Sequence, residues 1–459
     1  MEQQTITRVP PSPPTSGFLG HYRQITGDPL RFFTEMVQQY GDIVYLRVGR
    51  IHIYLINDPD DVERMLVTEN RNFRKPHLLH LAEETLGNGL LTSEGKFWLR
   101  QRRLAAPAFH RKRIEEYGRV MVERTEQMLQ QWNGKGHVDV HEAMMALTLE
   151  IVVSTLFGSD IGEDQEKRVG NILEIALDRF MDYQSVSYML FDWFPRPRKV
   201  RFQRAKRELD GLIFDIIRKR RASGISAEDD PTLLGMYLTA RDEDGSGMSD
   251  EQLRDECITI FLAGHETTAN LLTFAFYLLS RNPEKRKRLE AELDEVLGDR
   301  APTVDDLSQL IYTKQIVKET LRLFPPAWRV GRENIKMWRV GEYEIPPGSQ
   351  IFACQWILHR DPRWFERPEE FLPERWTEEF EATLPRYAWF PFGGGPRLCI
   401  GYAFAEMEAA LVLATIARKV KLEYKEEREP ELYPSITLRP EGGLSVEIIT
   451  KEREKIDET

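Results

Sequence analysis

The chain has 459 residues, of which 41% are apolar and 30% are charged, and its net charge is −11. This length allows one large domain with a substantial core, and the negative charge argues against a surface that binds nucleic acid or anionic lipid. Three cysteines, far apart and odd in number, do not form the pattern of a disulfide framework, which favours a reducing cytoplasm. They are Cys257, Cys354 and Cys399.

Residues 1–25 form a proline-rich lead-in that we expect to be extended, because Pro10, Pro11, Pro13 and Pro14 favour a polyproline conformation. The segment has no basic start followed by an apolar stretch, so the sequence predicts neither a signal peptide nor a transmembrane anchor. The expected location is the cytoplasm.

The predicted elements begin with a helix and a β-hairpin within residues 29–57, the strands being "IVYLRV" and "IHIYLI". From about residue 60 to 330 the pattern is mostly helical, and after Pro325 it changes to short strands and turns. A last helix follows Cys399, and "VKLEYK" and "LSVEIIT" are predicted closing strands. The sequence therefore predicts one α+β domain over residues 1–459, mainly α.

Residues 249–282 are predicted to form a long helix. Ser249 is a suitable N-cap with Gln252 three residues later, and Pro283 stops the helix. The middle of this helix is nearly all apolar, so a transmembrane span is one alternative. The polar residues His265, Glu266 and Asn270 near its centre argue against contact with lipid.

The segment "AGHETT", residues 263–268, is unusual for a core helix. A glycine within a helix costs about 1 kcal/mol relative to alanine, and a buried acid costs more unless it is satisfied. Ala263 and Gly264 would let a large group approach the backbone, and Thr267 lies one turn after Ala263 on the same face. The pattern indicates a site with Glu266 and Thr267 at its edge.

Two further motifs are ambiguous when each is taken alone. In "KETLRLFPP", Glu319 and Arg322 lie three residues apart on a helix, and "FLPERW" adds Arg375; such a pair is most often exposed and worth under ~1 kcal/mol. In "FPFGGGPRLCIG", residues 390–401, Cys399 follows three glycines without the Gly-Lys-Ser/Thr of a phosphate loop. A buried, inert cysteine is the alternative there.

In this order and spacing, the motifs together resemble the cytochrome P-450 family of haem-thiolate monooxygenases over nearly the whole chain. The resemblance assigns "AGHETT" to the oxygen-activating helix, and Glu319, Arg322 and Arg375 to a structural charge triad. Trp376 departs from the phenylalanine that is usual in the family, which changes packing. The residues that match the haem-binding loop are Phe392, Gly395, Arg397, Cys399 and Gly401.

The resemblance implies haem b, iron protoporphyrin IX, with the Cys399 thiolate as iron ligand and metal-binding residue. A thiolate needs neighbouring donors, and glycines let a loop lie against a flat ring. Glu266 and Thr267 are the implied acid–alcohol pair that delivers protons, while His265 receives no role. The other residues implied to contact haem are Trp98, Arg102, Ala263, Gly264, Arg332, Phe392, Arg397 and Gly401.

The implied reaction inserts one oxygen atom from O2 into a C–H bond of an apolar small molecule, such as a fatty acid or a terpenoid. The resemblance places substrate contacts near residues 75–90 and 180–198 and at Trp328, Arg329 and Val330. We expect Arg329 to meet a substrate carboxylate, with an ordinary exposed arginine as the alternative.

The sequence has neither a dinucleotide fingerprint nor an iron–sulfur cysteine cluster. Electrons must therefore come from a separate protein, either a ferredoxin with its reductase or a flavoprotein, unless peroxide replaces O2 and the electrons. The basic stretch "WLRQRRLAAPAFHRKR" suggests docking of an acidic donor, with Arg100 and Arg103 pointing outward. A monomer is expected.

Three alternatives remain open. The first is a haem-thiolate peroxygenase or isomerase, which often lacks the acid–alcohol pair seen at Glu266 and Thr267. The second is a non-catalytic haem sensor or carrier, which would need a second axial ligand. The third is a haem-free scaffold, which leaves Cys399 unexplained.

Overall fold

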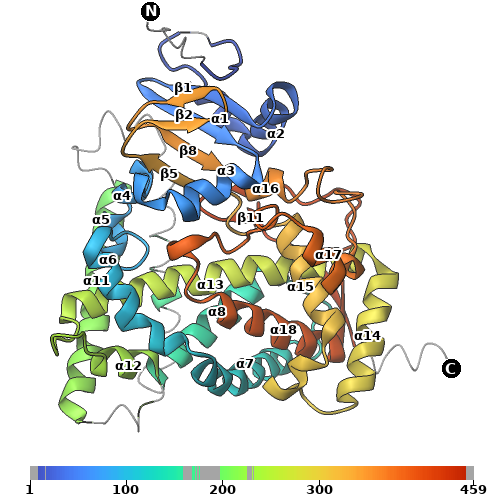
Figure 1. Cartoon of the computed structure of the whole chain (residues 1–459). Coiled ribbons are helices and arrows are strands. Elements are labelled where there is room, and N and C mark those ends of the chain that lie inside the picture. The colour runs from blue at the N-terminus through green and yellow to red at the C-terminus, as the bar shows by residue number, and fades with distance from the viewer. Residues whose placement is uncertain are drawn as a thin grey trace, which may run out of the picture. The chain divides into compact units, whose positions relative to one another are not determined.

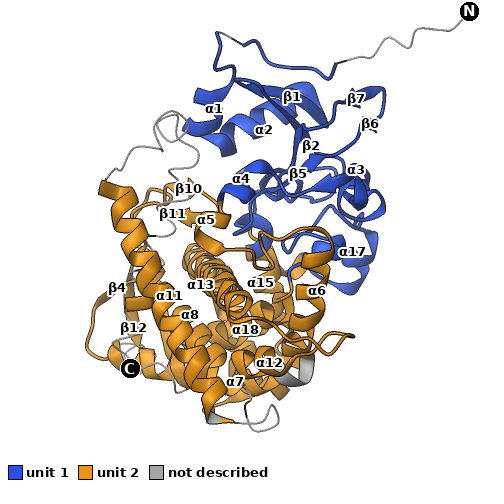
Figure 2. Cartoon of the chain, turned by 90° about the vertical axis from the view of Figure 1, so that its left-hand side faces the viewer, with its two compact units in different colours: residues 1–81, 321–370, 376–399 blue, residues 82–320, 371–375, 400–459 orange. Residues whose placement is uncertain are grey.

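The structure is a computed structural model that describes residues 9–15, 17–158, 168–170, 172, 175, 197–224, 230 and 232–450. The chain folds into two compact units, each made of segments that are far apart in sequence (Figure 2). Unit 1 comprises residues 1–81, 321–370 and 376–399, and unit 2 comprises residues 82–320, 371–375 and 400–459.

Unit 1 is built on a five-stranded sheet in the order β1-β2-β8-β5-β3 (Figure 1). The first two strands form the predicted hairpin, which turns between Val48 and Ile51 with Gly49 at φ +57°. β8 pairs parallel with β2 and antiparallel with β5, so the chain after residue 330 returns to the N-terminal hairpin. The strands are β1 (Ile43–Val48), β2 (Ile51–Ile56), β3 (Phe73–Arg74), β5 (Val330–Asn334) and β8 (Gln350–Ala353).

Short elements surround this sheet. A separate hairpin joins β6 (Trp338–Val340) to β7 (Tyr343–Ile345). The helices are α1 (Tyr22–Gly27), α2 (Pro29–Tyr40), α3 (Pro59–Glu63), α4 (His77–Leu81), α16 (Gln355–Leu358) and α17 (Glu378–Thr383), with a π-helical turn at Arg64–Thr68 and 3-10 turns at Asn70–Asn72 and Gly395–Arg397.

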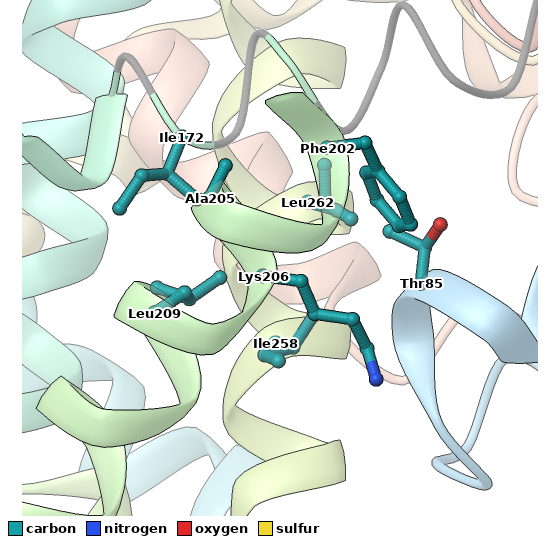
Figure 3. Close-up of a pocket in the computed structure, with 8 residues that line it drawn as sticks. All are labelled: Thr85, Ile172, Phe202, Ala205, Lys206, Leu209, Ile258 and Leu262. Carbon is teal, nitrogen blue, oxygen red and sulfur yellow. The ribbon is translucent and has the colours of Figure 1, made fainter. Parts of the chain in front are cut away.

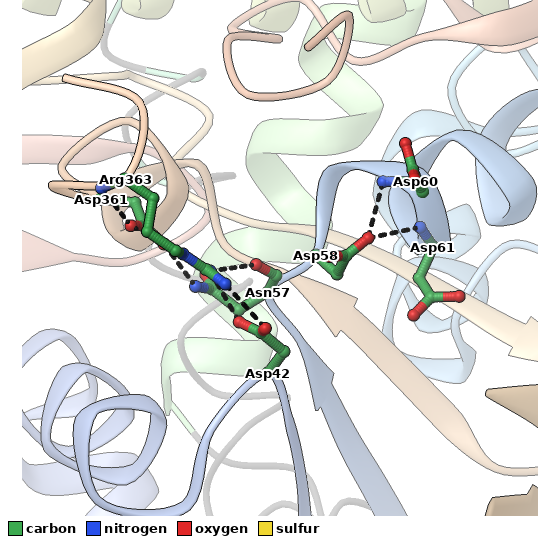
Figure 4. Close-up of polar contacts among 7 residues, drawn as sticks. All are labelled: Asp42, Asn57, Asp58, Asp60, Asp61, Asp361 and Arg363. Carbon is green, nitrogen blue, oxygen red and sulfur yellow. Dashed lines mark hydrogen bonds and ion pairs between the residues drawn. The ribbon is translucent and has the colours of Figure 1, made fainter. Parts of the chain in front are cut away.

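The arginine Arg363 ties distant segments of unit 1 together (Figure 4). Its Nη1 and Nη2 donate to the two carboxylate oxygens of Asp42 at 2.8 and 2.7 Å, and its Nε donates to Asp361 at 3.0 Å. It also reaches the carbonyl oxygen of Asn57 at 3.2 Å. These bonds raise the pKa of the guanidinium above its ordinary value and fix the β1–β2 edge to the segment after α16.

Unit 2 is mostly helical, as predicted for residues 60–330. Its helices are α5 (Glu83–Leu86), α6 (Gly95–Ala105), α7 (Arg111–Gln131), α8 (Val140–Phe157), α11 (Pro197–Ser223), α12 (Leu233–Thr239), α13 (Asp250–Arg281), α14 (Pro283–Leu297), α15 (Ile311–Leu323, whose last residues fall in unit 1) and α18 (Tyr402–Lys419), with 3-10 turns at Ala106–Phe109, Val304–Ser308 and Pro373–Arg375.

The C-terminal strands of unit 2 complete two small sheets. One has the order β4-β12-β9 and contains the predicted closing strands, and the other is the β10–β11 hairpin. The strands are β4 (His137–Asp139), β9 (Val420–Glu423), β10 (Leu432–Pro434), β11 (Leu438–Pro440) and β12 (Ser445–Thr450).

Helix α13 is the predicted long helix, and it begins with the predicted capping box. Ser249 Oγ accepts a hydrogen bond from the Gln252 amide at 3.2 Å, and Gln252 Oε1 accepts one from the Ser249 amide at 2.9 Å. Most of α13 is buried, and α8 packs along it, with the rings of Phe157 and Phe261 5.3 Å apart. The buried stretch that suggested a transmembrane alternative is therefore a core helix of unit 2.

Among the described helices, α8 alone is long and apolar enough to cross a membrane by length and composition. More than half of it, 56%, is buried inside the molecule, and a core helix passes the same test. The finding is weak support for a membrane span.

Candidate active site

One face of α13 is open in the middle of an otherwise buried helix. Ala263 is exposed, and Ile260, Gly264 and Thr267 are partly exposed, while the residues between them are buried. These four positions follow the i, i+3, i+4, i+7 spacing of a single helix face. A side chain at Gly264 would come within 3.0 Å of Val152 on α8, so this glycine also serves the close packing of the two helices.

The adjacent residues Glu266 and Thr267 make separate hydrogen bonds. Thr267 Oγ1 donates to the Ala263 carbonyl one turn earlier, at 2.7 Å. Glu266 is 2% exposed and accepts a hydrogen bond from Thr437 Oγ1 at 2.6 Å, with Arg439 Nη1 at 3.9 Å. Burial raises the pKa of the Glu266 carboxyl, and the contacts with Thr437 and Arg439 oppose that rise. The acid therefore points to the β10–β11 hairpin in this structure.

His265, to which the sequence assigned no role, is a packing residue. Its ring is buried and bonds to the Phe261 carbonyl at 2.6 Å, and its own carbonyl accepts from Thr148 Oγ1 of α8 at 2.9 Å. Burial lowers the pKa of His265 to about 4, so the imidazole is neutral near pH 7.

Cys399 is the exposed cysteine of the three; Cys257 and Cys354 are buried. Its amide donates to the Phe392 carbonyl at 3.1 Å, which closes the loop over the 3-10 turn at Gly395–Arg397. Gly395 has φ +63°, and a side chain there would meet the Leu66 carbonyl oxygen at 1.9 Å. The glycine is required by the loop itself, and the loop presents the cysteine outward.

The buried cysteines differ chemically from Cys399. Burial raises the pKa of the Cys354 thiol to about 12 and raises the pKa of Cys257 further. Neither forms thiolate near neutral pH, so neither is a suitable metal ligand or nucleophile.

In the predicted charge triad, Glu319 and Arg322 are buried, and the Arg375 side chain is 8% exposed. Glu319 Oε1 lies 3.1 Å from Arg375 Nε and accepts a hydrogen bond from the Leu372 amide at 2.9 Å. Arg322 is fully buried and donates to the carbonyl oxygens of His359, Pro368 and Glu370 at 2.9, 2.6 and 3.0 Å. The alternative of an exposed ion pair is wrong.

The residues predicted to contact haem propionates are partly exposed. Trp98 and Arg102 lie one turn apart on α6 in unit 2. Arg332 lies on β5 and Arg397 in the 3-10 turn before Cys399, both in unit 1.

The predicted substrate residues Trp328, Arg329 and Val330 lie where the chain enters β5. Trp328 is buried, with its ring stacked on Phe33 at 6.2 Å. The Arg329 guanidinium lies over the rings of Trp328 and Phe352, 4.5 and 4.8 Å from their centroids. Within the described part of the chain it has no carboxylate partner, and burial lowers its pKa.

A small apolar pocket lies in unit 2 between α11 and α13 (Figure 3). Thr85 of α5 also lines it, which falls within the predicted contact region 75–90. The other predicted region, 180–198, lies almost wholly outside the described residues. The pocket is lined by Thr85, Ile172, Phe202, Ala205, Lys206, Leu209, Ile258 and Leu262.

Residues 10–447 match the sequence model of the family described as Cytochrome P450. The chain belongs to the cytochrome P450 family.

Several bacterial P450 relatives align with nearly the whole chain. "Cyclooctatin synthase" of Streptomyces melanosporofaciens is 37% identical over 93% of this chain and 91% of the relative. "Cyclooctat-9-en-7-ol 5-monooxygenase" of the same organism is 34% identical over 90% and 89%. "Pentalenene oxygenase" of Streptomyces avermitilis is 32% identical over 87% and 88%.

Membership confirms the α+β, mainly α fold and an oxidoreductase that incorporates oxygen from O2. A P450 monooxygenase carries a haem-thiolate cofactor and requires O2 and a redox partner.

The residues present fit a haem group. Cys399 is exposed on a glycine loop, as a thiolate ligand requires. A side chain at Gly401, at the start of α18, would find only the Phe109 ring, at 3.8 Å, so the described protein atoms do not fill this space. Ala263 and Thr267 offer a small-residue face on α13.

Of the two arginines predicted to point outward, Arg103 is half-exposed as expected, whereas Arg100 is not. Arg100 is only 21% exposed; its Nε lies 3.1 Å from Asp242 Oδ2, and it also donates to Ser246 at 2.8 Å. Arg103 pairs with Asp242 at 3.5 Å and Glu243 at 2.8 Å. Both arginines neutralise the acidic loop between α12 and α13. The side chains of residues 111–113, at the start of α7, are not described.

Sequence reasoning missed Thr437 and Arg439 as partners of Glu266. Thr437 is 171 residues from the acid, and nothing in the local sequence of the hairpin marks it. The only available signal was the buried acid itself, which required some partner.

Proposed function

We propose that this P450 hydroxylates an apolar cyclic small molecule of the terpenoid kind. The observation that carries the proposal is Cys399, exposed at the end of a loop whose glycines are fixed by steric contact. Bound haem supplies O2 activation, with one oxygen atom entering a C–H bond of the substrate and the other leaving as water. The cofactor we propose is haem b, with Cys399 as the iron ligand.

The relatives support this substrate class. Two relatives are named for oxygenation of pentalenene and of cyclooctat-9-en-7-ol. We propose a cyclic alkene or alkenol ahead of a fatty acid.

The test supplies the haem-loaded protein with a ferredoxin, its reductase, NADPH and O2. Pentalenene and dodecanoic acid serve as separate probes, and mass spectrometry detects products that have gained one oxygen atom. Oxygenated pentalenene is the expected result. Oxygenation of dodecanoic acid alone, or of neither probe by a protein whose reduced form shows the thiolate CO spectrum, would contradict the proposed substrate class.

The remaining site roles follow from the family's motifs and are proposals here. Arg102, Arg332 and Arg397 would offset the propionate charges, Trp98 would donate to a propionate, and Phe392 would pack beside the haem. Electrons would come from a separate ferredoxin with its reductase or from a flavoprotein. We further propose a cytoplasmic monomer.

Glu266 and Thr267 are proposed to deliver protons at the open face of α13. A carboxyl group whose pKa is raised by burial holds its proton closer to neutral pH, which suits a general acid. The Thr267 hydroxyl lies on the partly exposed face, where it can donate to a bound group when it leaves the Ala263 carbonyl.

Thr267→Ala is expected to keep substrate binding and NADPH consumption but to divert reducing equivalents to peroxide. General acid–base groups typically contribute about 10²–10⁴-fold, so product formed per NADPH should fall at least tenfold. Peroxide and product are measured in the same reaction. Thr273→Ala is the matched control, because Thr273 is a buried threonine of the same helix whose hydroxyl donates to the Ala269 carbonyl. Unchanged product yield in both Thr267→Ala and Glu266→Gln would contradict the role.

Arg329 is proposed to meet a polar group of the substrate. Its guanidinium is desolvated against two aromatic rings without an acid among the described residues, so a bound carboxylate or hydroxyl would find an available cation.

If Arg329 meets a carboxylate, a fatty acid should bind roughly 10-fold more tightly than its methyl ester, because a charge-assisted hydrogen bond is lost in the ester. Arg329→Leu should remove this difference in affinity. Spectral titration of the haem-loaded protein measures both affinities. Arg339→Leu is the control, because Arg339 is exposed and paired with Glu344. Equal affinity for acid and ester in the unaltered protein would refute this role.

A further inference from the structure

The hairpin β10–β11, and not the neighbouring Thr267, determines where the Glu266 carboxyl group points. Thr437 lies in the turn of this hairpin, and its hydroxyl donates to Glu266 Oε1 at 2.6 Å. The carboxyl group is almost fully buried, so this bond is its principal polar contact among the described residues, apart from Arg439 at 3.9 Å. A substitution that removes the Thr437 hydroxyl is therefore expected to change the orientation of the Glu266 carboxyl group.

The contacts continue beyond Thr437 toward the surface. Asn270 lies one turn after Glu266 on α13, and its Nδ2 is 3.5 Å from Thr437 Oγ1. Its Oδ1 is 3.1 Å from Nε2 of His141, the second residue of α8. Asn270 and Thr437 are buried, whereas His141 is partly exposed. A line of polar groups therefore connects the buried acid with a partly solvated imidazole.

This line has a definite direction when Glu266 is ionised. A carboxylate only accepts, so Thr437 gives its single hydroxyl proton to Glu266 and must accept from the Asn270 amide. The Asn270 oxygen then faces His141, which must carry its proton on Nε2.

A protonated Glu266 also permits the opposite direction. The carboxylic acid then donates to Thr437, the Thr437 hydroxyl donates to the Asn270 oxygen after the amide turns over, and His141 accepts at Nε2 with its proton on Nδ1. The ring tautomer of His141 is therefore coupled to the direction of this line of hydrogen bonds.

We propose that Thr437, Asn270 and His141 are positioning residues that set the orientation and proton affinity of Glu266. The inference rests on the proposed role of Glu266 as proton donor. Other charged groups act on the same chain: Arg439 faces both Glu266 and His141, and Asp139, the N-cap of α8, faces His141. Burial lowers the pKa of His141, so its neutral tautomers are the relevant forms near pH 7.

The experiment compares Thr437→Val, which removes the hydroxyl and keeps the shape, with Thr437→Ser, which restores the hydroxyl. The haem-loaded protein is labelled with ¹⁵N-histidine, reduced and saturated with CO. The chain has nine histidines, and the His141 signals are those lost in His141→Gln. The ¹⁵N shifts give the His141 tautomer ratio, and product per NADPH is measured on the same preparations.

Thr437→Val is expected to shift the His141 tautomer ratio and to lower product per NADPH roughly tenfold, because a misplaced catalytic group loses much of its contribution. Thr437→Ser should restore both. Thr273→Val, at a buried threonine outside this line of polar groups, should leave both unchanged. If Thr437→Val does not fold, Asn270→Leu replaces it, because it interrupts the line between Thr437 and His141. The His141 tautomer ratio and product per NADPH are measured in the same way.

The inference and the proposed function fail separately. If Thr437→Val and Asn270→Leu keep the tautomer ratio and product yield of the unaltered protein, the positioning role is refuted, whatever Glu266→Gln does. If Glu266→Gln leaves the product yield unchanged but Thr437→Val shifts the tautomer ratio, the positioning role stands and Glu266 is not the proton donor.

Discussion

Cys399→Ser is expected to abolish both the thiolate CO spectrum of the reduced protein and all oxygenation. A serine hydroxyl does not ionise near neutral pH and cannot replace a thiolate as electron-rich ligand. Cys399 is exposed on its loop, so the substitution removes the proposed ligand without disturbing a packed core. The measurement is the absorption spectrum of the reduced, CO-saturated protein beside a product assay.

Cys257→Ser and Cys354→Ser are the matched controls. Both thiols are buried, and burial raises their pKa values far above neutral, to about 12 for Cys354, so neither supplies a thiolate. Both variants should keep the thiolate spectrum. A thiolate spectrum that persists in Cys399→Ser, or that disappears in either control while haem is retained, would show that the ligand assignment is wrong.

Glu319→Gln is expected to destabilise the fold and cause loss of haem. The glutamate is fully buried, and its Oε1 contacts both the Arg375 guanidinium and the Leu372 amide. Neutralising it removes the negative charge that faces Arg375, whose side chain is only 8% exposed. Removing one partner of a buried pair typically costs about 3–5 kcal/mol, a large fraction of a domain's net stability.

Glu35→Gln provides the same chemical change at an exposed pair. Glu35 pairs with Arg31 four residues earlier, and both side chains are at least half exposed. Exposed ion pairs contribute under ~1 kcal/mol, so the urea concentration at the unfolding midpoint should be nearly unchanged in this variant. Urea unfolding and haem content are measured for both. A Glu319→Gln protein that remains stable and haem-loaded but turns over slowly would mean that Glu319 is catalytic and not structural.

Helix α13 and the cysteine loop could be predicted from the sequence because local signals determine them. The capping box at Ser249 and Gln252 needs only residues three apart, and Pro283 ends the helix by chain geometry. The glycine run before Cys399 marks a backbone that other residues cannot adopt, as Gly395 at φ +63° confirms.

Helical spacing predicted faces but not partners. It correctly placed Ala263 and Thr267 on one face, which the structure shows to be open. Helical spacing also turned Arg100 and Arg103 outward. Arg100 instead packs into the loop after α12, and the acidic residues of that loop come some 140 residues after the arginines in the chain. A periodicity calculation treats everything outside the helix as solvent, and here another segment of unit 2 fills that side.

By itself, the sequence determined the family, the fold class, the long helix and the cysteine loop, because these depend on neighbouring residues and on motif order. Only the tertiary structure decided that Glu266 is held by Thr437, that His141 connects with it through Asn270, and that Arg322 is satisfied by three backbone carbonyls. The physical reason is that burial obliges each polar group to find a partner, but packing of distant segments determines which partner is within reach.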